Sequence, residues 1–140
     1  MSERTHEGGC LCGAVRYRID GPLRDVVVCH CSRCRRSHGH VAAYSDCATA
    51  DLTITDGTSL RWYEADGRRR GFCSRCGASL FWQRDDEPET TAVAAGTLDP
   101  PTGLRTVAHI FTATPGDYYE SAGEGQRFER GLPSGRPYRR

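Results

Sequence analysis

Apolar and polar residues alternate over many short stretches of the chain. In residues 14–19, three apolar side chains alternate with two arginines, and this two-residue period is that of a half-buried strand. Further strands are expected at 24–28, 41–45, 52–55, 60–64, 68–72, 79–82, 91–96 and 106–111. Asp66-Gly67 predicts a hairpin turn, and residues 33–38 are expected to form one short helical turn that Gly39 ends. The pattern therefore predicts an all-β fold.

The two ends of the chain lack this alternation. Ordered structure is expected to begin near Gly8, and the strand at 106–111 is expected to be the last one. From Pro115 onward the composition shifts to glycine, arginine, glutamate and proline, so contacts with the folded part are needed to order this segment. We expect one domain over residues 1–140, with a core at about 8–112 and a C-terminal extension at 113–140.

Composition and net charge limit the classes of partner and of chemistry that the sequence supports. The chain has 140 residues and a net charge of +1, so the overall charge gives no reason to expect nucleic acid or an anionic membrane as a partner. All 19 basic residues are arginine, and the lack of lysine excludes Schiff-base chemistry from a lysine side chain. No stretch approaches 18 apolar residues and the first residues form no apolar signal segment. We therefore expect a cytoplasmic protein.

Three cysteines lie within six residues, at Cys29, Cys31 and Cys34. Residues two apart on an extended segment point to the same side, and a helical turn then brings the third thiol back toward them. Three sulfurs converging at about 2.3 Å from one zinc ion would leave one of its four tetrahedral positions open, as is common in catalytic zinc sites. In a reducing cytosol, clustered cysteines indicate metal binding and not disulfides.

Charged and ionisable residues follow this motif directly. Arg35 and Arg36 are candidates for holding a carboxylate of a substrate, although arginines at a surface can equally be a solvated face. His38 is a further candidate for substrate binding. The fourth ligand of the open site is expected to be water, Cys47, His38 or His40, and Cys47 is otherwise a buried apolar thiol.

A second metal site is expected at Cys73 and Cys76, where two thiols two residues apart precede a glycine. Two more ligands are needed, and either Cys10 with Cys12 or Cys31 with Cys34 can supply them. The first grouping is favoured because the 38 residues between Cys34 and Cys73 exceed the spacing of about 15 to 20 that is typical of zinc ribbons. It also leaves the three-thiol motif intact, so two zinc ions per chain are expected.

Four motifs occur together in the chain: Gly9-Cys10-Leu11-Cys12-Gly13, Cys29-His30-Cys31-Ser32-Arg33-Cys34-Arg35-Arg36, Phe72-Cys73-Ser74-Arg75-Cys76-Gly77 and the His109-Ile110 strand. In order and spacing this set resembles the glutathione-dependent formaldehyde-activating enzyme (GFA) family, also called the centromere-protein-V/GFA domain. The resemblance covers about residues 8–112. It implies an Mss4-like fold of β-sheets around zinc, and a carbon–sulfur lyase that joins formaldehyde to glutathione in the reverse direction.

The same resemblance implies which cysteines serve which site. Cys10, Cys12, Cys73 and Cys76 look like the structural zinc site, and Cys29, Cys31 and Cys34 look like the catalytic one. The chain departs from the family pattern after Arg36, where Ser37-His38-Gly39-His40 replaces small residues, and after Ile110, where the family often carries lysine and tryptophan.

Two other classes of function are compatible with the sequence. A non-catalytic zinc module could bind a protein or a nucleic acid through Arg68, Arg69 and Arg70 and the arginines of the extension. A redox or iron–sulfur protein would also use clustered cysteines. The expected function is a zinc enzyme acting on a thiol adduct such as that of glutathione with formaldehyde or another aldehyde. The expected partner is a small-molecule thiol, no membrane partner is expected, nucleic acid is the less favoured alternative, and the oligomeric state is left open.

Overall fold

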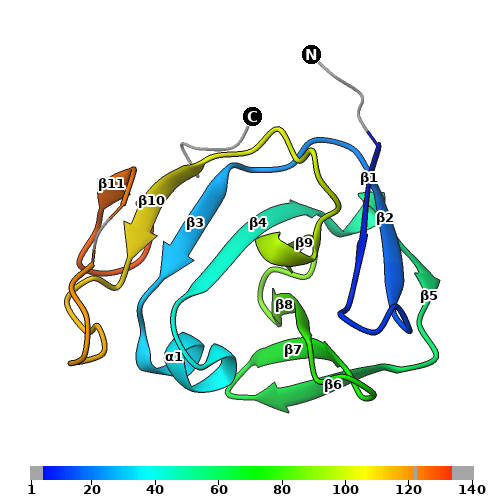
Figure 1. Cartoon of the computed structure of the whole chain (residues 1–140), viewed down its shortest axis with the longest axis horizontal. Helices are drawn as coiled ribbons and strands as arrows, with labels where there is room; N and C mark the ends of the chain where they lie inside the picture. The colour runs from blue at the N-terminus through cyan, green and yellow to red at the C-terminus, as the bar shows by residue number, and fades with distance from the viewer. Residues whose placement is uncertain (1–4, 122, 134–140) are drawn as a thin grey trace.

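The computed structural model describes residues 5–121 and 123–133 of the chain, and strands make up most of its regular structure (Figure 1). The strands are β1 (Thr5–Gly9), β2 (Arg16–Asp20), β3 (Val26–Cys29), β4 (Ala42–Ala48), β5 (Leu52–Asp56), β6 (Leu60–Ala65), β7 (Arg68–Cys73), β8 (Ser79–Arg84), β9 (Thr90–Ala94), β10 (Thr106–Ile110) and β11 (Gln126–Arg127). The helical segments are α1 (Ser32–His38) and two 3-10 turns, η1 (Thr49–Asp51) and η2 (Ala95–Thr97). The prediction of an all-β fold with one short helical turn is confirmed.

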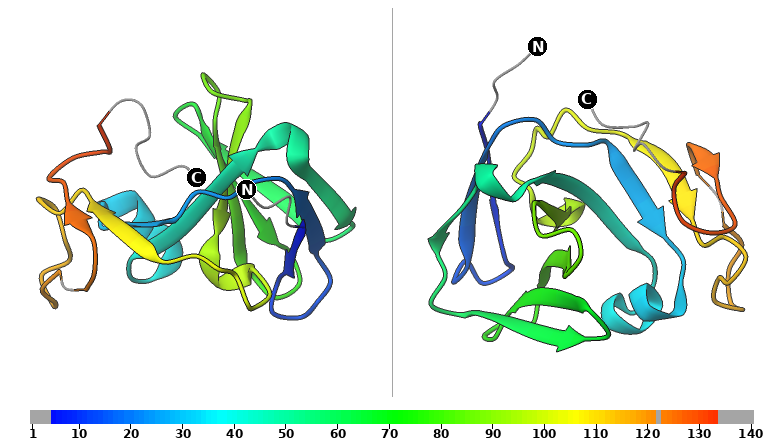
Figure 2. Two further views of the ribbon diagram at one scale, coloured as in Figure 1. Left: turned by 90° about the horizontal axis from the view of Figure 1, so that it is seen from above. Right: turned by 180° about the vertical axis from the view of Figure 1, so that it is seen from behind.

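The strands form two sheets. The small sheet has the order β1-β2-β5 and is antiparallel. The large sheet has the order β11-β10-β3-β4-β9-β8-β7-β6, and within it β10 runs parallel to both β3 and β11. The large sheet curls, so the β6–β7 hairpin at its far end lies near α1, the helix that follows β3 (Figure 1; Figure 2). There Asp66 of the hairpin turn contacts Arg33 of α1 at 3.4 Å.

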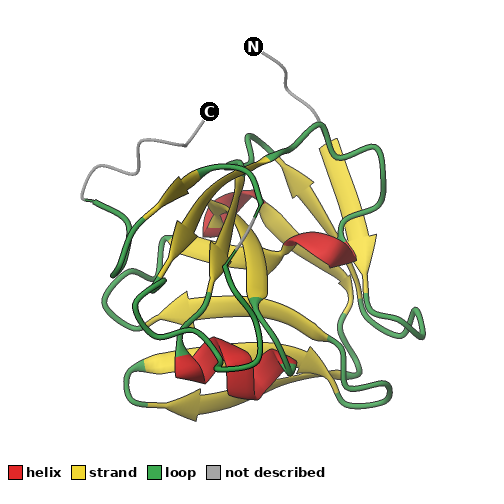
Figure 3. Cartoon of the chain, turned by 60° about the vertical axis from the view of Figure 1, so that its left-hand side comes forward, coloured by secondary structure: helices red, strands yellow, loops and turns green. Residues whose placement is uncertain are grey.

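The helical segments are short compared with the strands that surround them (Figure 3). The only α-helix within the described part of the chain, α1, has seven residues and ends at Gly39, which adopts the left-handed conformation at φ 83°. A glycine takes this conformation without steric cost, which is why the helix stops where the sequence predicted. No helix among residues 5–121 and 123–133 is both long and apolar enough to cross a membrane.

Most predicted strands shift by one or two residues at their ends, and the strand expected at 91–96 ends at Ala94, before the 3-10 turn η2. Three larger differences from the sequence prediction also occur. β1 begins at Thr5, before Gly8, and pairs with β2 along its whole length. β4 continues to Ala48, so residues 46–49 are mostly strand and not a connection. β11 lies in the C-terminal extension, so the strand at 106–111 is not the last one. In each case pairing with a neighbouring strand decides the conformation, and local apolar alternation does not reveal it.

The two faces of the large sheet carry different side chains. On one face Cys47, Phe81 and Val93 are fully buried and pack with Tyr17 and Ile19 of the small sheet to form the main core. Alternate residues of the same strands point to the opposite face. That face carries a smaller buried cluster made of Cys29, Cys34, Ala42, Tyr44 and Ala94. The three-thiol motif therefore lies on the side of the sheet away from the main core.

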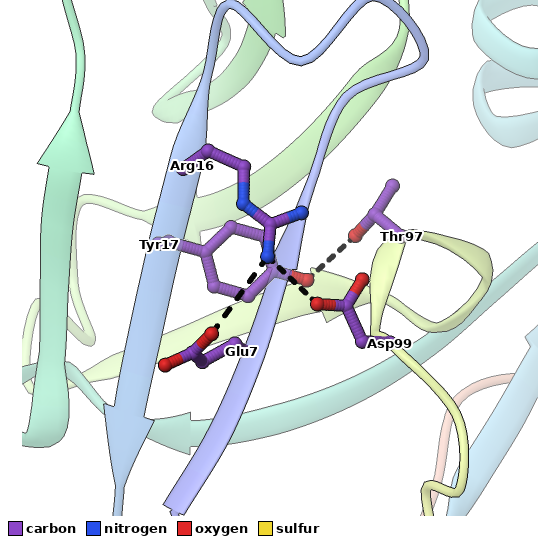
Figure 4. Close-up of polar contacts among 5 residues, drawn as sticks. All are labelled: Glu7, Arg16, Tyr17, Thr97 and Asp99. Carbon is purple, nitrogen blue, oxygen red and sulfur yellow. Dashed lines mark hydrogen bonds and ion pairs between the residues drawn. The ribbon is translucent and has the colours of Figure 1, made fainter.

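A group of polar contacts joins the small sheet to the segment after β9 (Figure 4). The buried Tyr17 hydroxyl lies 2.7 Å from Oγ1 of Thr97. Arg16 Nη2 lies 2.7 Å from Oδ2 of Asp99 and 3.9 Å from Oε1 of Glu7. These contacts fix the small sheet, whose β1–β2 turn carries two of the eight cysteines, against the large sheet.

The described part of the C-terminal extension returns to the edge of the large sheet. The chain turns at Phe111, which has a positive φ of 56°. The amides of Phe111 and Thr112 then donate to the carbonyls of Arg130 and Phe128, and the amide of Phe128 donates to the carbonyl of His109 at 2.8 Å. These backbone hydrogen bonds are contacts with the folded part of the chain, of the kind expected to order the extension. Residues 134–140 lie outside the described part of the chain.

Candidate metal centres

Four cysteines from two distant turns meet at one point. Cys10 and Cys12 lie between β1 and β2, and Cys73 and Cys76 lie at the end of β7 and in the following turn. Their Sγ atoms all lie within 4.8 Å of one another, with 3.7 Å between Cys10 and Cys12 and 3.8 Å between Cys12 and Cys73. Sulfurs at about 2.3 Å from a central tetrahedral ion stand roughly 3.8 Å apart. The donors and their spacing therefore fit a zinc ion closed by four thiolates.

Backbone amides face these sulfurs. The amide of Val15 donates to Cys10 Sγ at 3.3 Å, and the amides of Arg75 and Cys76 donate to Cys73 Sγ at 3.3 and 3.5 Å. The backbone amides of Ala78 and Cys12 lower the pKa of Cys76 to about 6. Because hydrogen bonds to a thiolate favour the ionised form, these amides favour the state of Cys76 that metals bind.

The three-thiol motif forms a second group that is built locally. Cys29 ends β3, Cys31 is the N-cap of α1, and Cys34 lies in the first turn of that helix. The three Sγ atoms lie within 4.8 Å of one another, and Cys31 Sγ accepts a hydrogen bond from the Cys34 amide at 3.4 Å. Hydrogen bonds from the Cys29 and Cys34 thiols lower the pKa of Cys31 to about 2, while Cys29 has a raised pKa because of its hydrogen bonds with the other two thiols. Three thiols that share protons in this way can hold a metal ion.

These three cysteines line a cavity of about 760 Å³, a size within the range of small-molecule sites. Six strands and α1 contribute to its walls, and Gly131, Leu132 and Pro133 of the C-terminal extension also line it. Tyr44 and Trp82 also line it, so the cavity has apolar as well as charged walls. The three-thiol group is therefore accessible to a molecule in the cavity.

The cavity wall is rich in arginine. Arg24 is buried and pairs with the buried Asp46, with Nη1 and Oδ2 3.3 Å apart. Arg33, Arg68 and Arg84 also line the cavity. Asp46 and Glu87 line the cavity as well, and the larger number of arginines leaves a net positive charge that favours an anionic ligand.

The arginine run of β7 does not form one surface. Arg68 and Arg70 line the cavity, whereas Arg69 points to the opposite face of the sheet. There its guanidinium stacks 4.0 Å above the Trp62 ring and its Nε donates to Gln83 Oε1 at 2.7 Å. The alternation of strand side chains explains this division.

The three residues expected to bind substrate beside the open site, Arg35, Arg36 and His38, do not line the cavity. Arg35 and Arg36 are not among the cavity-lining residues: Arg36 is exposed, and Arg35 packs beneath Gly116 of the extension, where an added Cβ would lie 3.1 Å from Arg35 Cδ. His38 does not line the cavity either, but its Nε2 lies 2.9 Å from the Tyr44 hydroxyl, which belongs to a cavity residue.

The other candidate fourth ligands are also placed away from the three-thiol group. Cys47 is fully buried in the main core on the opposite face of the sheet. His40 is exposed, and its Nδ1 lies 2.7 Å from the Tyr118 hydroxyl. Among the described residues, no fourth cysteine, histidine, aspartate or glutamate joins Cys29, Cys31 and Cys34 in their group.

The histidines that sequence analysis set aside form a buried hydrogen-bonded chain. His109 Nε2 lies 3.0 Å from the carbonyl of Glu124, and because a carbonyl only accepts, this nitrogen is the donor. Burial lowers the pKa of both His30 and His109, so both are neutral. His109 Nδ1 therefore accepts from His30 Nε2 at 2.9 Å, and His30 Nδ1 accepts from the Tyr119 hydroxyl at 2.8 Å. The chain ties the extension to the residue between Cys29 and Cys31.

Several residues that line the cavity were not identified from the sequence. Tyr44 and Trp82 were assigned only to strands, and Arg70 was grouped with its two neighbours as a surface run. The two-residue period of β7 was a usable signal, since it separates Arg68 and Arg70 from Arg69. Nothing local in the sequence places residues 131–133 at the cavity, because that contact depends on the path of the whole extension.

Comparisons with known proteins agree on one family. Residues 5–114 match the model of the family described as glutathione-dependent formaldehyde-activating enzyme. A Halomonas elongata protein provisionally named glutathione-dependent formaldehyde-activating enzyme is 38% identical over 103 residues, which cover 66% of this chain and 65% of that relative. The chain thus spans slightly less than two thirds of the length of this relative.

A solved structure is similar as well. The crystal structure of a Rhodobacter sphaeroides protein is 30% identical with a TM-score of 0.57, and the match covers 71% of this chain and 97% of the other. The family match extends over most of the chain and includes all seven clustered cysteines, whose two groups the fold assembles. This chain belongs to the glutathione-dependent formaldehyde-activating enzyme family.

Proposed function

We propose that this chain is a zinc-dependent enzyme of the carbon–sulfur lyase type that forms and breaks the bond between the glutathione sulfur and the carbon of formaldehyde. The observation that carries the proposal is the three-thiol group, which opens into a cavity of about 760 Å³ and gains no fourth protein ligand from the described residues. The family and the name of the Halomonas elongata relative support the choice of substrates.

The two cysteine groups have separate roles in this proposal. Cys10, Cys12, Cys73 and Cys76 hold a structural zinc ion, and Cys29, Cys31 and Cys34 hold a catalytic one. When bound at the three-thiol group, zinc offers an open position that can take a thiolate or polarise a carbonyl oxygen. β3 and α1 would hold the three ligands beside the cavity, since all three cysteines line it.

Arginines of the cavity wall bind the carboxylates of glutathione. Arg33, Arg68 and Arg84 line the cavity, and a guanidinium can hold a carboxylate through two parallel hydrogen bonds. These three residues take the role that the sequence suggested for Arg35 and Arg36. Trp82, on the same wall, offers an apolar surface to the rest of the tripeptide.

The reaction needs no further reactant. The thiol loses its proton, the thiolate sulfur forms a bond to the carbonyl carbon, and the electron pair of the C=O π bond moves to oxygen. The oxygen then takes up a proton, so the sum is glutathione plus formaldehyde giving S-hydroxymethylglutathione. Cleavage follows the same steps in reverse. The enzyme must position two reactants and stabilise charge on sulfur and oxygen.

Zinc content and exchange kinetics test this function. Elemental analysis of protein purified without chelator is expected to give two zinc ions per chain, and NMR exchange spectroscopy is expected to show that the protein speeds conversion between glutathione and its formaldehyde adduct. Cys34→Ser is expected to retain one zinc ion and to lose the acceleration. Cys47→Ala, in the main core, is expected to keep two zinc ions and the acceleration. An exchange rate equal to the uncatalysed one in the wild type would refute the proposed substrates.

A further inference from the structure

Arg70 has an unusual position among the arginines of the cavity. It lies on β7 opposite Trp82 of β8, and both side chains line the cavity that the three thiols face. Its Nη1 atom is buried and has no hydrogen-bond partner among the described residues. A buried donor without a partner is costly for a folded protein, so a group of the ligand is the natural partner for this nitrogen.

Each of the other arginines of the wall contacts a carboxylate or a backbone carbonyl. Arg24 pairs with Asp46, Arg33 with Asp66 at 3.4 Å and Arg84 with Asp86 at 2.8 Å. Arg68 Nη1 donates to the carbonyl of residue 66 at 3.0 Å. Within residues 5–121 and 123–133, Arg70 is thus the cavity arginine with a buried guanidinium nitrogen left unsatisfied.

The charge of Arg70 acts close to the three-thiol group. After burial, the positive charge of Arg70 is the second cause that lowers the pKa of His38. Burial raises the pKa of Tyr44, and the charge of Arg70 together with a hydrogen bond from its side chain opposes that shift. Arg70, Tyr44 and the three thiols all line the same cavity.

We propose that the Arg70 guanidinium binds the substrate oxygen that becomes negatively charged when a thiolate adds to an aldehyde. The inference rests on the proposed function. As the S–C bond forms, the C=O π electron pair moves to oxygen, and the Nη1 proton of Arg70 hydrogen-bonds to that oxygen until it takes up the proton that the thiol released. In the reverse direction Arg70 holds the alkoxide whose electron pair re-forms the carbonyl. This is the role of an oxyanion-binding donor.

Two stable glutathione derivatives isolate this role without turnover. S-carboxymethylglutathione carries an anionic oxygen near the position of the reactive one, and S-methylglutathione lacks it. Isothermal titration of both ligands gives the contribution of the anionic group to affinity, and repeating it with Arg70→Gln completes a double-difference cycle. We expect the wild type to prefer the carboxymethyl ligand by more than tenfold and Arg70→Gln to lose that preference, with its affinity for the methyl ligand changed less than threefold.

Arg68→Gln is the matched control, because Arg68 lies on the same strand and the same cavity wall. It is expected to keep the preference for the carboxymethyl ligand. In exchange kinetics Arg70→Gln is expected to lower kcat/KM by about 10²- to 10³-fold, the loss typical of a removed oxyanion donor, while keeping two zinc ions. Retention of both zinc ions shows that the variant is folded and that the loss does not come from the metal site.

Each contrary outcome has a distinct meaning. If Arg70→Gln weakens both ligands equally, Arg70 is a general carboxylate contact and the inference is wrong while the proposed function stands. If Arg70→Gln loses the zinc ion of the three-thiol group, Arg70 supports the metal site and the inference is again wrong. If the wild type binds neither ligand, the assignment of glutathione fails, and the inference that rests on it fails too.

Discussion

The two cysteine groups of this chain use the same ligand atoms in opposite ways. The four-thiol group joins residues far apart in the sequence, such as Cys12 and Cys73, which are 61 positions apart. The three-thiol group comes from one continuous segment, in which Cys29, Cys31 and Cys34 take their geometry from the end of β3 and the first turn of α1. A ligand set drawn from distant turns ties the fold together, whereas a local set can be organised without contributing to the fold.

The surroundings of the two groups sharpen this contrast. The four-thiol group is complete in itself, since four thiolates fill the tetrahedral shell of zinc. The three-thiol group leaves a position open and faces a cavity with charged and apolar walls. The proposed function therefore assigns stability and reactivity to different cysteine groups, and we expect that each can be perturbed without the other.

The largest expected effect is the loss of the fold when the four-thiol group is broken. Cys73→Ser removes a fully buried sulfur that belongs both to this group and to the main core. Loss of a structural metal site is among the most destabilising changes known in proteins, and we expect a cost above about 4 kcal/mol in the free energy of unfolding. Thermal unfolding followed by circular dichroism measures it.

Cys31→Ser is the matched change in the other group, at a half-buried thiol of the three-thiol motif. We expect it to lower the free energy of unfolding by less than about 1.5 kcal/mol, since only a local contact is lost. The contrast between the two groups would be wrong if both variants lowered stability by similar amounts.

Metal removal gives the next largest effect. A chromogenic chelator added to the protein is expected to remove zinc in two phases, with the three-thiol group releasing its ion at least about tenfold faster, because it has one protein ligand fewer and opens into a cavity. The Cys31→Ser variant assigns the phases, since it should lack the fast one. A single phase for both ions in the wild type would contradict the difference between the sites.

The sequence alone predicts the three-thiol group more fully than the four-thiol group. The spacing within Cys29, Cys31 and Cys34 was sufficient to predict their convergence, because the geometry of a strand end and a helical turn is local. The grouping of Cys10 and Cys12 with the second pair could be favoured only from spacing, because it depends on how two turns are brought together by the sheets. In the structure Cys10 and Cys12 do lie together with Cys73 and Cys76.

The walls of the cavity were the part that the sequence could not predict. Arg35 and Arg36 were natural candidates because they adjoin Cys34, but a seven-residue helix turns them away from the cavity. Arg70 reaches the same space because the large sheet curls until β7 faces α1, which is a property of strand twist summed over several strands. Proximity in sequence was therefore a good guide to the three-thiol group and a poor guide to the residues that line the cavity.

A smaller effect is expected at the link between the extension and the three-thiol group. Tyr119→Phe removes the donor to His30 Nδ1, and we expect a loss of about 1 kcal/mol in the free energy of unfolding. Because His30 lies between two of the thiols, zinc release from the three-thiol group should become severalfold faster, with the slow phase unchanged. Urea unfolding and the chelator assay measure the two effects.

Tyr118→Phe is the control for this change. Tyr118 is 58% exposed and its hydroxyl contacts His40, which is also exposed and lies outside the three-thiol group. The variant is expected to alter neither stability nor zinc release measurably. Equal effects of the two tyrosine substitutions would show that the extension acts on the thiols by packing, and not through the histidine chain.

The smallest effect is expected at the ion pair that docks the small sheet. The side chains of Arg16 and Asp99 are 38% and 49% exposed, and pairs this accessible to solvent contribute only about 0.2–1 kcal/mol because water and salt screen them. Arg16→Gln should therefore lower the free energy of unfolding by less than about 1 kcal/mol, with the difference shrinking in high salt. The slow phase of zinc release should stay unchanged, since the four-thiol group itself holds the β1–β2 turn against the end of β7. If Arg16→Gln instead speeds the slow phase of zinc release, the docking of the small sheet positions the four thiols. The comparison of the two sites implies the opposite, namely that the four thiols hold the small sheet in place.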